Sequence, residues 1–321
     1  MEIAIIGAGG VGGYYGAKMA NAGYDVLFVA RGEHLKAIRA NGLQIKSIHG
    51  DFSVNPARVT DKVSDLTKSD FILLGMKAWQ VTEVARELKG LIKDDATILP
   101  LQNGVMAFDE LAQELGSTHI INGLCRIFSK IESPGVISHL GFDPVIIFGE
   151  RDNKVTGRVN TLKEIFDHSG IKSRIAQDIQ SELWKKFINI CASGLLAVTR
   201  ATYGELREIK ETRQMMQALF EEIYVLSQEM GICIENDFIS RTMSFVDSFA
   251  YDATSSLTRD VWEGKPSEIE YQNGTVVRLA QQYGVHTPVN KFIYECILPM
   301  EKKARRKGPG TRDEGRGTRD K

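Results

Sequence analysis

The sequence predicts an α/β fold for the first half of the chain and an all-helical fold for the second. Three observations lead to this prediction. An apolar strand, a glycine-rich turn and a helix follow one another from the first residues onward. Further apolar segments with the length of buried strands alternate with helical segments up to residue 175. From residue 178 the pattern is helical almost throughout.

The bulk properties indicate a soluble protein with two domains. A chain of 321 residues exceeds the usual size of a single hydrophobic core. Its 40 basic and 41 acidic residues nearly cancel, so no global charge favours nucleic acid or a membrane as partner. No apolar run could span a bilayer, and the first strand leaves no room for a signal peptide. We therefore expect a cytoplasmic protein.

The cysteines and histidines do not form a pattern typical of a metal site. The four cysteines lie far apart without a C-x-x-C pair, which is typical of reduced structural thiols. The six histidines lack the spacing of metal ligands. We therefore expect no bound metal.

A glycine-rich turn after the first predicted strand, Glu2–Ile6, indicates a dinucleotide site. Its residues are Gly7, Ala8, Gly9, Gly10, Val11 and Gly12. In the spacing G-x-G-x-x-G, the first glycine turns the chain, the second admits a pyrophosphate and the third packs the helix on the strand. The N-terminus of the following helix would direct its N–H groups at the phosphates. Because a strand precedes the turn and another follows on schedule, we favour a Rossmann-type domain over a mere tight turn.

Arg31 indicates which dinucleotide the turn would bind. It follows the second predicted strand, residues 25–29. An acidic residue at this position would hydrogen-bond the ribose of NAD, whereas an arginine can bind the 2′-phosphate of NADP. A solvated surface arginine is the alternative. We predict NADPH as the cofactor.

Two more polar residues follow predicted strands. Lys77 stands after strand 70–76, and Asn103 stands after strand 96–101. The ligand crevice of an open parallel sheet lies outside the carboxyl ends of its strands, so both residues are expected at the cofactor. Residues 120–149 are predicted to form mostly antiparallel strands that close the sheet.

The second domain is predicted to consist of five helices. They are expected at residues 181–198, 212–230, 237–251, 268–283 and 288–306. The domain boundaries would be 1–175 for the NADP-binding domain and 176–301 for a helical substrate and catalytic domain. Residues 302–321 contain nine basic residues and nothing apolar larger than one alanine, which predicts a disordered tail.

The first of these helices carries the candidates for chemistry. Hydride transfer from a nicotinamide to a carbonyl creates an alkoxide, which needs a proton donor. A lysine on a mostly apolar helix suits this task because burial lowers its pKa. Lys185 and Lys186 are the candidates, and Lys186 and Asn189 can share a helix face. A surface salt bridge is the alternative role for these lysines.

With these residues in place, the chain resembles the ketopantoate reductases (2-dehydropantoate 2-reductases) over residues 1–300. The resemblance rests on several motifs in order, of which Lys-Ala-Trp-Gln and Glu-Ile-Glu-Tyr-x-Asn-Gly are specific. The motifs are Gly7–Gly12, Arg31, Lys77-Ala78-Trp79-Gln80, Gln102-Asn103-Gly104, Glu182-Leu183-Trp184-Lys185-Lys186, Gly204-Glu205-Leu206, Ser255-Ser256-Leu257, Glu268-Ile269-Glu270-Tyr271-Gln272-Asn273-Gly274 and Gly284-Val285-His286-Thr287-Pro288.

The resemblance implies NADPH-dependent reduction of 2-dehydropantoate to (R)-pantoate, in pantothenate and coenzyme A biosynthesis. It implies that Lys186 donates the proton to the carbonyl oxygen. Asn103 and Lys77 would hold nicotinamide, ribose or substrate. Ser256 would bind the substrate carboxylate, and Glu268 would reach the cofactor from the helical domain.

The chain departs from the family pattern after the lysine. Family members often carry asparagines four and eight residues after it, where this chain has Ile190 and Gly194 counted from Lys186. Asn189 and Ser193 each stand one residue earlier and are the candidates for substrate binding. This departure concerns the substrate contacts and not the class of reaction.

The same departure leaves two lysines open as the donor. Counted from Lys185, Asn189 falls into place, but the fixed spacing from Trp184 favours Lys186. Two other functions fit the chain: a reductase of another branched 2-oxo acid, and a non-catalytic NADPH-binding regulator. The expected partner is a small 2-oxo acid. A homodimer is compatible with the sequence.

Overall fold

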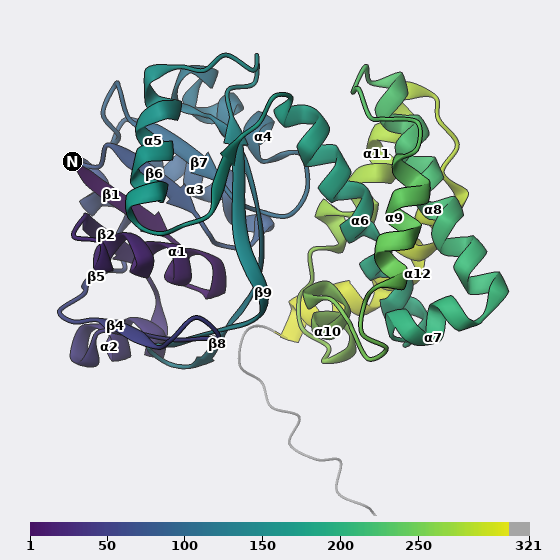
Figure 1. Ribbon diagram of the computed structural model, residues 1–321, viewed down its shortest axis with the longest axis horizontal. Helices are drawn as coiled ribbons and strands as arrows, with labels where there is room; N and C mark the ends of the chain where they lie inside the picture. Colours follow the sequence, from purple (N-terminus) through teal and green to yellow (C-terminus); the bar gives the residue numbers. More distant parts are fainter. Residues whose placement is uncertain (308–321) are drawn as a thin grey trace, which may run out of the picture. The chain divides into compact units, whose positions relative to one another are not determined.

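The computed structural model describes residues 1–307, and the chain divides into two compact units (Figure 1). The first unit, Met1–Phe187, contains all the strands found in the described part of the chain. The second unit begins at Ile188 and is helical over its described residues. The predicted fold class is therefore confirmed.

Five parallel strands form the sheet that carries the glycine turn. Their spatial order is β5–β2–β1–β6–β7. The order reverses between β1 and β6, and ligands of such sheets bind outside the carboxyl ends of the strands at this reversal. The strands are β1 (Glu2–Ile6), β2 (Asp25–Val29), β5 (Arg58–Thr60), β6 (Phe71–Leu74) and β7 (Thr97–Pro100).

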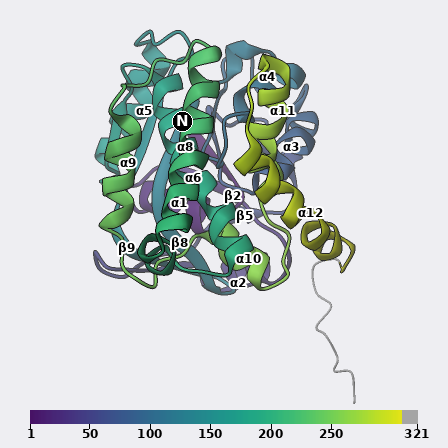
Figure 2. The ribbon, with the colours of Figure 1, turned by 90° about the vertical axis from the view of Figure 1, so that its right-hand side faces the viewer.

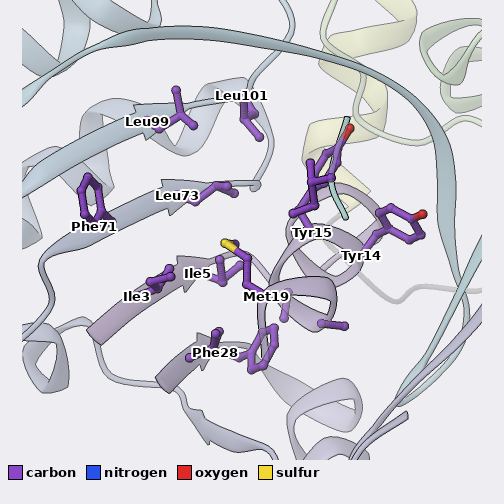
Figure 3. Close-up of a cluster of buried hydrophobic side chains, with 14 of the residues drawn as sticks. Ile3, Ile5, Tyr14, Tyr15, Met19, Phe28, Phe71, Leu73, Leu99 and Leu101 are labelled. Carbon is purple, nitrogen blue, oxygen red and sulfur yellow. The ribbon is translucent and has the colours of Figure 1, made fainter. Parts of the chain in front are cut away.

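Apolar side chains cover both faces of this sheet. In β1, Ile3 and Ile5 pack in the cluster that contains the apolar residues of α1, whereas Ala4 and Ile6 pack with those of α3 and α4. Figure 3 shows the first of these clusters. A strand buried on both faces reads as an unbroken apolar run, which is why β1 was recognisable. The helices of this unit are α1 (Gly10–Asn21), α2 (Gly32–Asn41), α3 (Val81–Leu88), α4 (Ala107–Leu115) and α5 (Gly157–His168), with the 3-10 helices η1 (Val63–Leu66), η2 (Ala78–Gln80) and η3 (Ser117–His119).

A second sheet contains the long hairpin of the first unit. The predicted antiparallel pairing is confirmed in β8 (Asn122–Ser133) and β9 (Val136–Gly149), but the prediction that these strands close the first sheet was wrong. The chain enters β8 beside β7, and β9 then pairs with β3 and β10 in a second sheet, which the sequence did not indicate. The remaining strands of this sheet are β3 (Leu43–Ser47), β4 (Phe52–Val54) and β10 (Ser173–Ile175).

Helix α1 packs between the two sheets because it carries glycines on both contact faces. A Cβ at Gly16 would lie 2.5 Å from the ring of Phe28 in β2. A Cβ at Gly13 would lie 3.0 Å from the side chain of Ile137 in β9. The start of α1 is therefore fixed from two sides.

The second unit is a bundle of helices (Figure 2). Its core includes the apolar stripe of α8, in which Leu219, Phe220 and Ile223 are fully buried. No helix within residues 1–307 is long and apolar enough to cross a membrane. The helices are α6 (Ile179–Thr199), which begins in the first unit, α7 (Tyr203–Glu208), α8 (Lys210–Glu229), α9 (Phe238–Asp247), α10 (Ser256–Trp262), η4 (Ile269–Tyr271), α11 (Asn273–Tyr283) and α12 (Pro288–Lys307).

Two predicted helices and the start of the predicted tail were wrong in extent, whereas the predicted helix 288–306 is confirmed as α12. The predicted helix 237–251 ends already at Asp247. The predicted helix 268–283 is divided into η4 and α11, because Gln272 has φ −113° and ψ −106°, outside the helical region. Residues 302–307 continue α12 instead of belonging to a tail. Buried Ala304 and the 2.7 Å ion pair of Arg305 with Glu301 hold this last turn. The rest of the predicted tail, 308–321, lies outside the described residues.

Gly12→Ala is expected to destabilise the protein by about 1–3 kcal/mol, the usual cost of overpacking a core. The added Cβ would clash with the carbonyl oxygen of Gly7 and lie 2.9 Å from Ile5. Gly9→Ala is the matched control, since its Cβ would meet no atom within 4 Å. Urea unfolding measures both, and equal midpoints for the two variants would contradict the packing argument.

Candidate cofactor and catalytic site

The glycine turn is closed on one side and open on the other. Gly7 has φ +90°, and a Cβ there would lie 2.6 Å from the backbone nitrogen of Met76, after β6. A Cβ on Gly75 would lie 2.7 Å from the backbone of Gly12. Gly9 faces open space. The turn is thus packed on the loop after β6, while its backbone at Gly9 stays accessible to a ligand.

Helix α1 presents an N-terminus suited to an anion. Its N-cap is Gly9, which offers no side-chain cap, and its first turn contains no acidic residue. The first N–H groups of a helix have no partner within the helix and carry a partial positive charge. The start of α1 is therefore suited to bind a pyrophosphate, and a glycine turn with a purely structural role would not require these features.

Arg31 lies at the start of α2, directly beyond β2. It is exposed and occupies the N-cap position with an extended backbone, φ −133° and ψ 161°. An exposed guanidinium at a helix N-terminus combines two features that bind phosphate groups. The structure places Arg31 at the carboxyl edge of the first sheet, as the sequence predicted.

Lys77 and Asn103 stand in two loops that one side chain ties together. Gln102 donates through Nε2 to the carbonyl oxygens of Leu74 at 3.0 Å and Met76 at 3.2 Å. This couples the loop after β7, with Asn103, to the loop after β6, with Lys77. Sequence reasoning noted Gln102 in a motif but missed this role, because its partners are backbone atoms in a distant segment.

The ammonium group of Lys77 is held near an aromatic ring. Its Nζ lies 5.7 Å from the centroid of Trp79, within the range of a cation–π contact. Both side chains are half-buried. Trp79 lies in η2, and Lys77 is the N-cap residue of that helix, after the carboxyl end of β6.

Lys186 lies near the buried thiol of Cys125 in β8. Burial raises the pKa of the Cys125 thiol, and the nearby positive charge of Lys186 partly opposes that rise. Cys125 itself donates to the carbonyl oxygen of Leu101, two residues before Asn103, at 3.8 Å. The positive charge of Lys186 is therefore near a thiol that contacts the segment leading to Asn103.

The other predicted site residues belong to the second unit. Asn189 on α6 is half-buried, and Ser193 is buried with its carbonyl oxygen accepting from Thr258 Oγ1 at 3.0 Å. Ser256 is the exposed first residue of α10, while Glu268 is buried at 5% exposure. The N-cap of α10 is Ser255, which accepts from the backbone of Thr258. The hydrogen bond between Ser193 and Thr258 joins α6 to α10, so the candidates Ser193 and Ser256 lie on linked elements.

The departure at Gly194 has a structural reason. A Cβ at this position would clash with Oδ1 of Asn273 and lie 2.7 Å from Ile293. Asn273 in turn donates through Nδ2 to the carbonyl oxygen of Cys191 at 3.2 Å and to Asn290 at 2.9 Å. The space that a longer side chain would fill is thus occupied by Asn273. Sequence reasoning missed this role of Asn273, although a motif contained it.

No group of three or more metal-ligating side chains occurs within the described residues.

The sequence matches the family described as "Ketopantoate reductase PanE/ApbA" over residues 3–153, and its C-terminal part over residues 178–301. The chain belongs to this family. A 2-dehydropantoate 2-reductase from Nostoc sp. is 31% identical over 301 residues, covering 92% of this chain and 94% of its own. The resemblance seen in the sequence is confirmed, and the protein is an oxidoreductase of the ketopantoate reductase family.

Solved structures support the same family and fold. A PanE/ApbA family ketopantoate reductase from Ralstonia eutropha JMP134 has a TM-score of 0.88 and 27% identity, covering 95% of this chain and 100% of that one. A D-mandelate dehydrogenase solved with NADH and anilino(oxo)acetate has a TM-score of 0.85 and 22% identity, covering 95% and 99%. At that identity the second likeness establishes the fold alone.

Gly194→Asn, which introduces the residue that many family members carry there, is expected to destabilise this protein by about 1–3 kcal/mol. The new side chain would displace Asn273 from its bonds to Cys191 and Asn290. Urea unfolding tests this, with Gly157→Ala as control because its Cβ meets no atom within 4 Å. Unchanged stability of Gly194→Asn would mean that Asn273 does not fill this space.

Proposed function

We propose that this protein reduces 2-dehydropantoate to (R)-pantoate with NADPH. The observation that carries the proposal is the open glycine turn at the carboxyl edge of the first sheet, with exposed Arg31 after β2 and Lys77 after β6. A carbonyl reductase needs a positive charge and a proton at that edge. The name of the Nostoc relative supports the choice of substrate.

The cofactor would be held by residues of the first unit. The open backbone at Gly9 and the uncapped start of α1 would bind the pyrophosphate. Arg31 would bind the 2′-phosphate, and Lys77 with Asn103 would bind ribose, nicotinamide or substrate. When bound, NADPH supplies the hydride.

Lys186 would act on the substrate carbonyl. Its ammonium group would attract the negative charge that develops on the oxygen and then deliver a proton to that atom. Ser256 would bind the substrate carboxylate, and Glu268 would contact the cofactor. Asn189 and Ser193 would contact the substrate.

A reductase of another 2-oxo acid is the second candidate. The occupation of the Gly194 site by Asn273 favours it, because the chain lacks an asparagine side chain at that position. The D-mandelate dehydrogenase of this fold was solved with NADH and a different oxo acid, which supports a wider range of substrates for the fold. A non-catalytic NADPH-binding regulator is the third candidate.

The deciding experiment measures NADPH oxidation with 2-dehydropantoate and with a panel of other branched 2-oxo acids. The highest kcat/KM is expected for 2-dehydropantoate. A higher value for another acid would favour the second candidate. Tight NADPH binding without turnover of any acid would favour the regulator.

Lys186→Ala is expected to lower kcat by about 10²–10⁴-fold, the usual contribution of a positioned proton donor. NADPH affinity should change little, because the phosphate contacts remain. Lys185→Ala is the matched control on the same helix and should retain activity. If Lys185→Ala alone abolishes turnover, the two assignments are to be exchanged.

Arg31→Ala is expected to weaken NADPH binding by about 10- to 100-fold, because a charge-assisted hydrogen bond usually contributes this much to binding affinity. NADH binding should change far less, since NADH lacks the 2′-phosphate. Lys36→Ala removes a positive charge from the same helix, where Lys36 pairs with Glu33 at 2.7 Å, and serves as control. Equal losses for both dinucleotides would rule out the 2′-phosphate contact.

A further inference from the structure

One histidine joins the glycine turn to the helix that carries Arg31. His34, in the first turn of α2, places Nε2 2.8 Å from the carbonyl oxygen of Ala8. Its Nδ1 accepts the backbone N–H of Gly135 at 3.0 Å. Three segments, the glycine turn, α2 and the β8–β9 turn, therefore meet at this ring.

The two bonds define how the ring is protonated. The N–H of Gly135 can only donate, so Nδ1 must be an acceptor without a proton. The carbonyl oxygen of Ala8 can only accept, so Nε2 must carry the proton. His34 is thus bound as the neutral ring with its hydrogen on Nε2.

The contact to Ala8 controls the direction of the next N–H group. The carbonyl of Ala8 and the N–H of Gly9 belong to one planar trans peptide, in which they point in opposite directions. When His34 holds the carbonyl, the N–H of Gly9 is turned away from α2. Gly13 leaves room for this arrangement, because a Cβ there would lie 2.9 Å from the same oxygen.

The third segment is itself anchored. The carbonyl of Gly135 accepts the N–H of Gln44 in β3 at 2.9 Å, and a Cβ on Gly135 would lie 3.0 Å from Ala37 of α2. His34 therefore connects the glycine turn to a fixed part of the second sheet. Arg31 stands three residues before His34, so the same anchor sets its position relative to the turn.

We propose that His34 is a positioning residue of the dinucleotide site. It holds the Ala8–Gly9 peptide in the orientation that binds pyrophosphate. It also keeps Arg31 at a fixed distance from the glycine turn. This role rests on the proposed function, because it requires a dinucleotide at the glycine turn. In this role His34 acts through the glycine turn and Arg31, and it takes no part in proton transfer.

The two bonds can be tested separately with amide side chains. Gln at position 34 can place an N–H near the site of Nε2 and donate to Ala8, whereas Asn can place an oxygen near Nδ1 and accept from Gly135. His34→Ala and His34→Asn are expected to raise the Kd for NADPH and for NADH by about tenfold, the value of one lost hydrogen bond to an ordered site. His34→Gln should restore most of this affinity.

The steady-state readout separates positioning from general damage. The KM for NADPH should rise in His34→Ala, while kcat at saturating NADPH stays within about threefold of the unaltered protein, since the proton donor is intact. His119→Ala is the matched control. Its ring Nδ1 lies 3.1 Å from the carbonyl oxygen of Ala96, at the amino end of β7, away from the glycine turn. It should lower stability to a similar extent and leave both dinucleotide affinities unchanged.

The outcomes distinguish this proposal from the proposed function. If the unaltered protein binds neither dinucleotide, the proposed function fails, and the role of His34 fails with it. If the unaltered protein binds NADPH and His34→Ala binds it equally well, only the role of His34 is overturned. A loss in His34→Ala that His119→Ala reproduces and His34→Gln does not relieve would likewise overturn it.

Discussion

Direct packing of backbone on backbone at Gly7, Gly12 and Gly75 is the constraint on which the first unit depends. A Cβ at any of these positions would meet main-chain atoms closer than real side chains allow. Their close approach brings the loop after β1 against the loop after β6 at the reversal of strand order. This leaves Gly9 as the open face of the turn and places Lys77 in the adjoining loop. The close packing of the three glycines thus leaves the backbone at Gly9 accessible to a ligand.

Charge is distributed along the carboxyl edge of that sheet in a consistent way. The uncapped start of α1 and exposed Arg31 suit the phosphate groups of a dinucleotide. Lys77 stands in the loop after β6, which Gln102 joins to the loop of Asn103, where the proposed reduction would develop negative charge. The arrangement favours a reductase over a protein that merely binds the cofactor, because a binding protein would need only the phosphate contacts.

The parts that could be predicted depend on local patterns. β1, the glycine turn and α1 were predictable because a buried parallel strand is an unbroken apolar run and the turn has fixed glycine spacing. The strand β5, with three residues, is too short to show any period. The break at Gln272 was missed because the surrounding residues are compatible with a helix, and only contacts elsewhere in the bundle decide where it ends. The second sheet was missed because β3 and β9 pair across about ninety residues, as in the register of Ile45 with Ile137.

The sequence by itself determined the class of fold, the family and the identity of most candidate residues, because these depend on motifs of a few neighbouring positions. The tertiary structure alone showed that the positive charge of Lys186 lies near the thiol of Cys125. It alone showed that Asn273 occupies the space beside Gly194, and that His34 binds Ala8 and Gly135. His34 and Gly135 are 101 positions apart. Hydrogen bonds and close packing require atoms to meet in space, and no local pattern specifies which distant segments will do so.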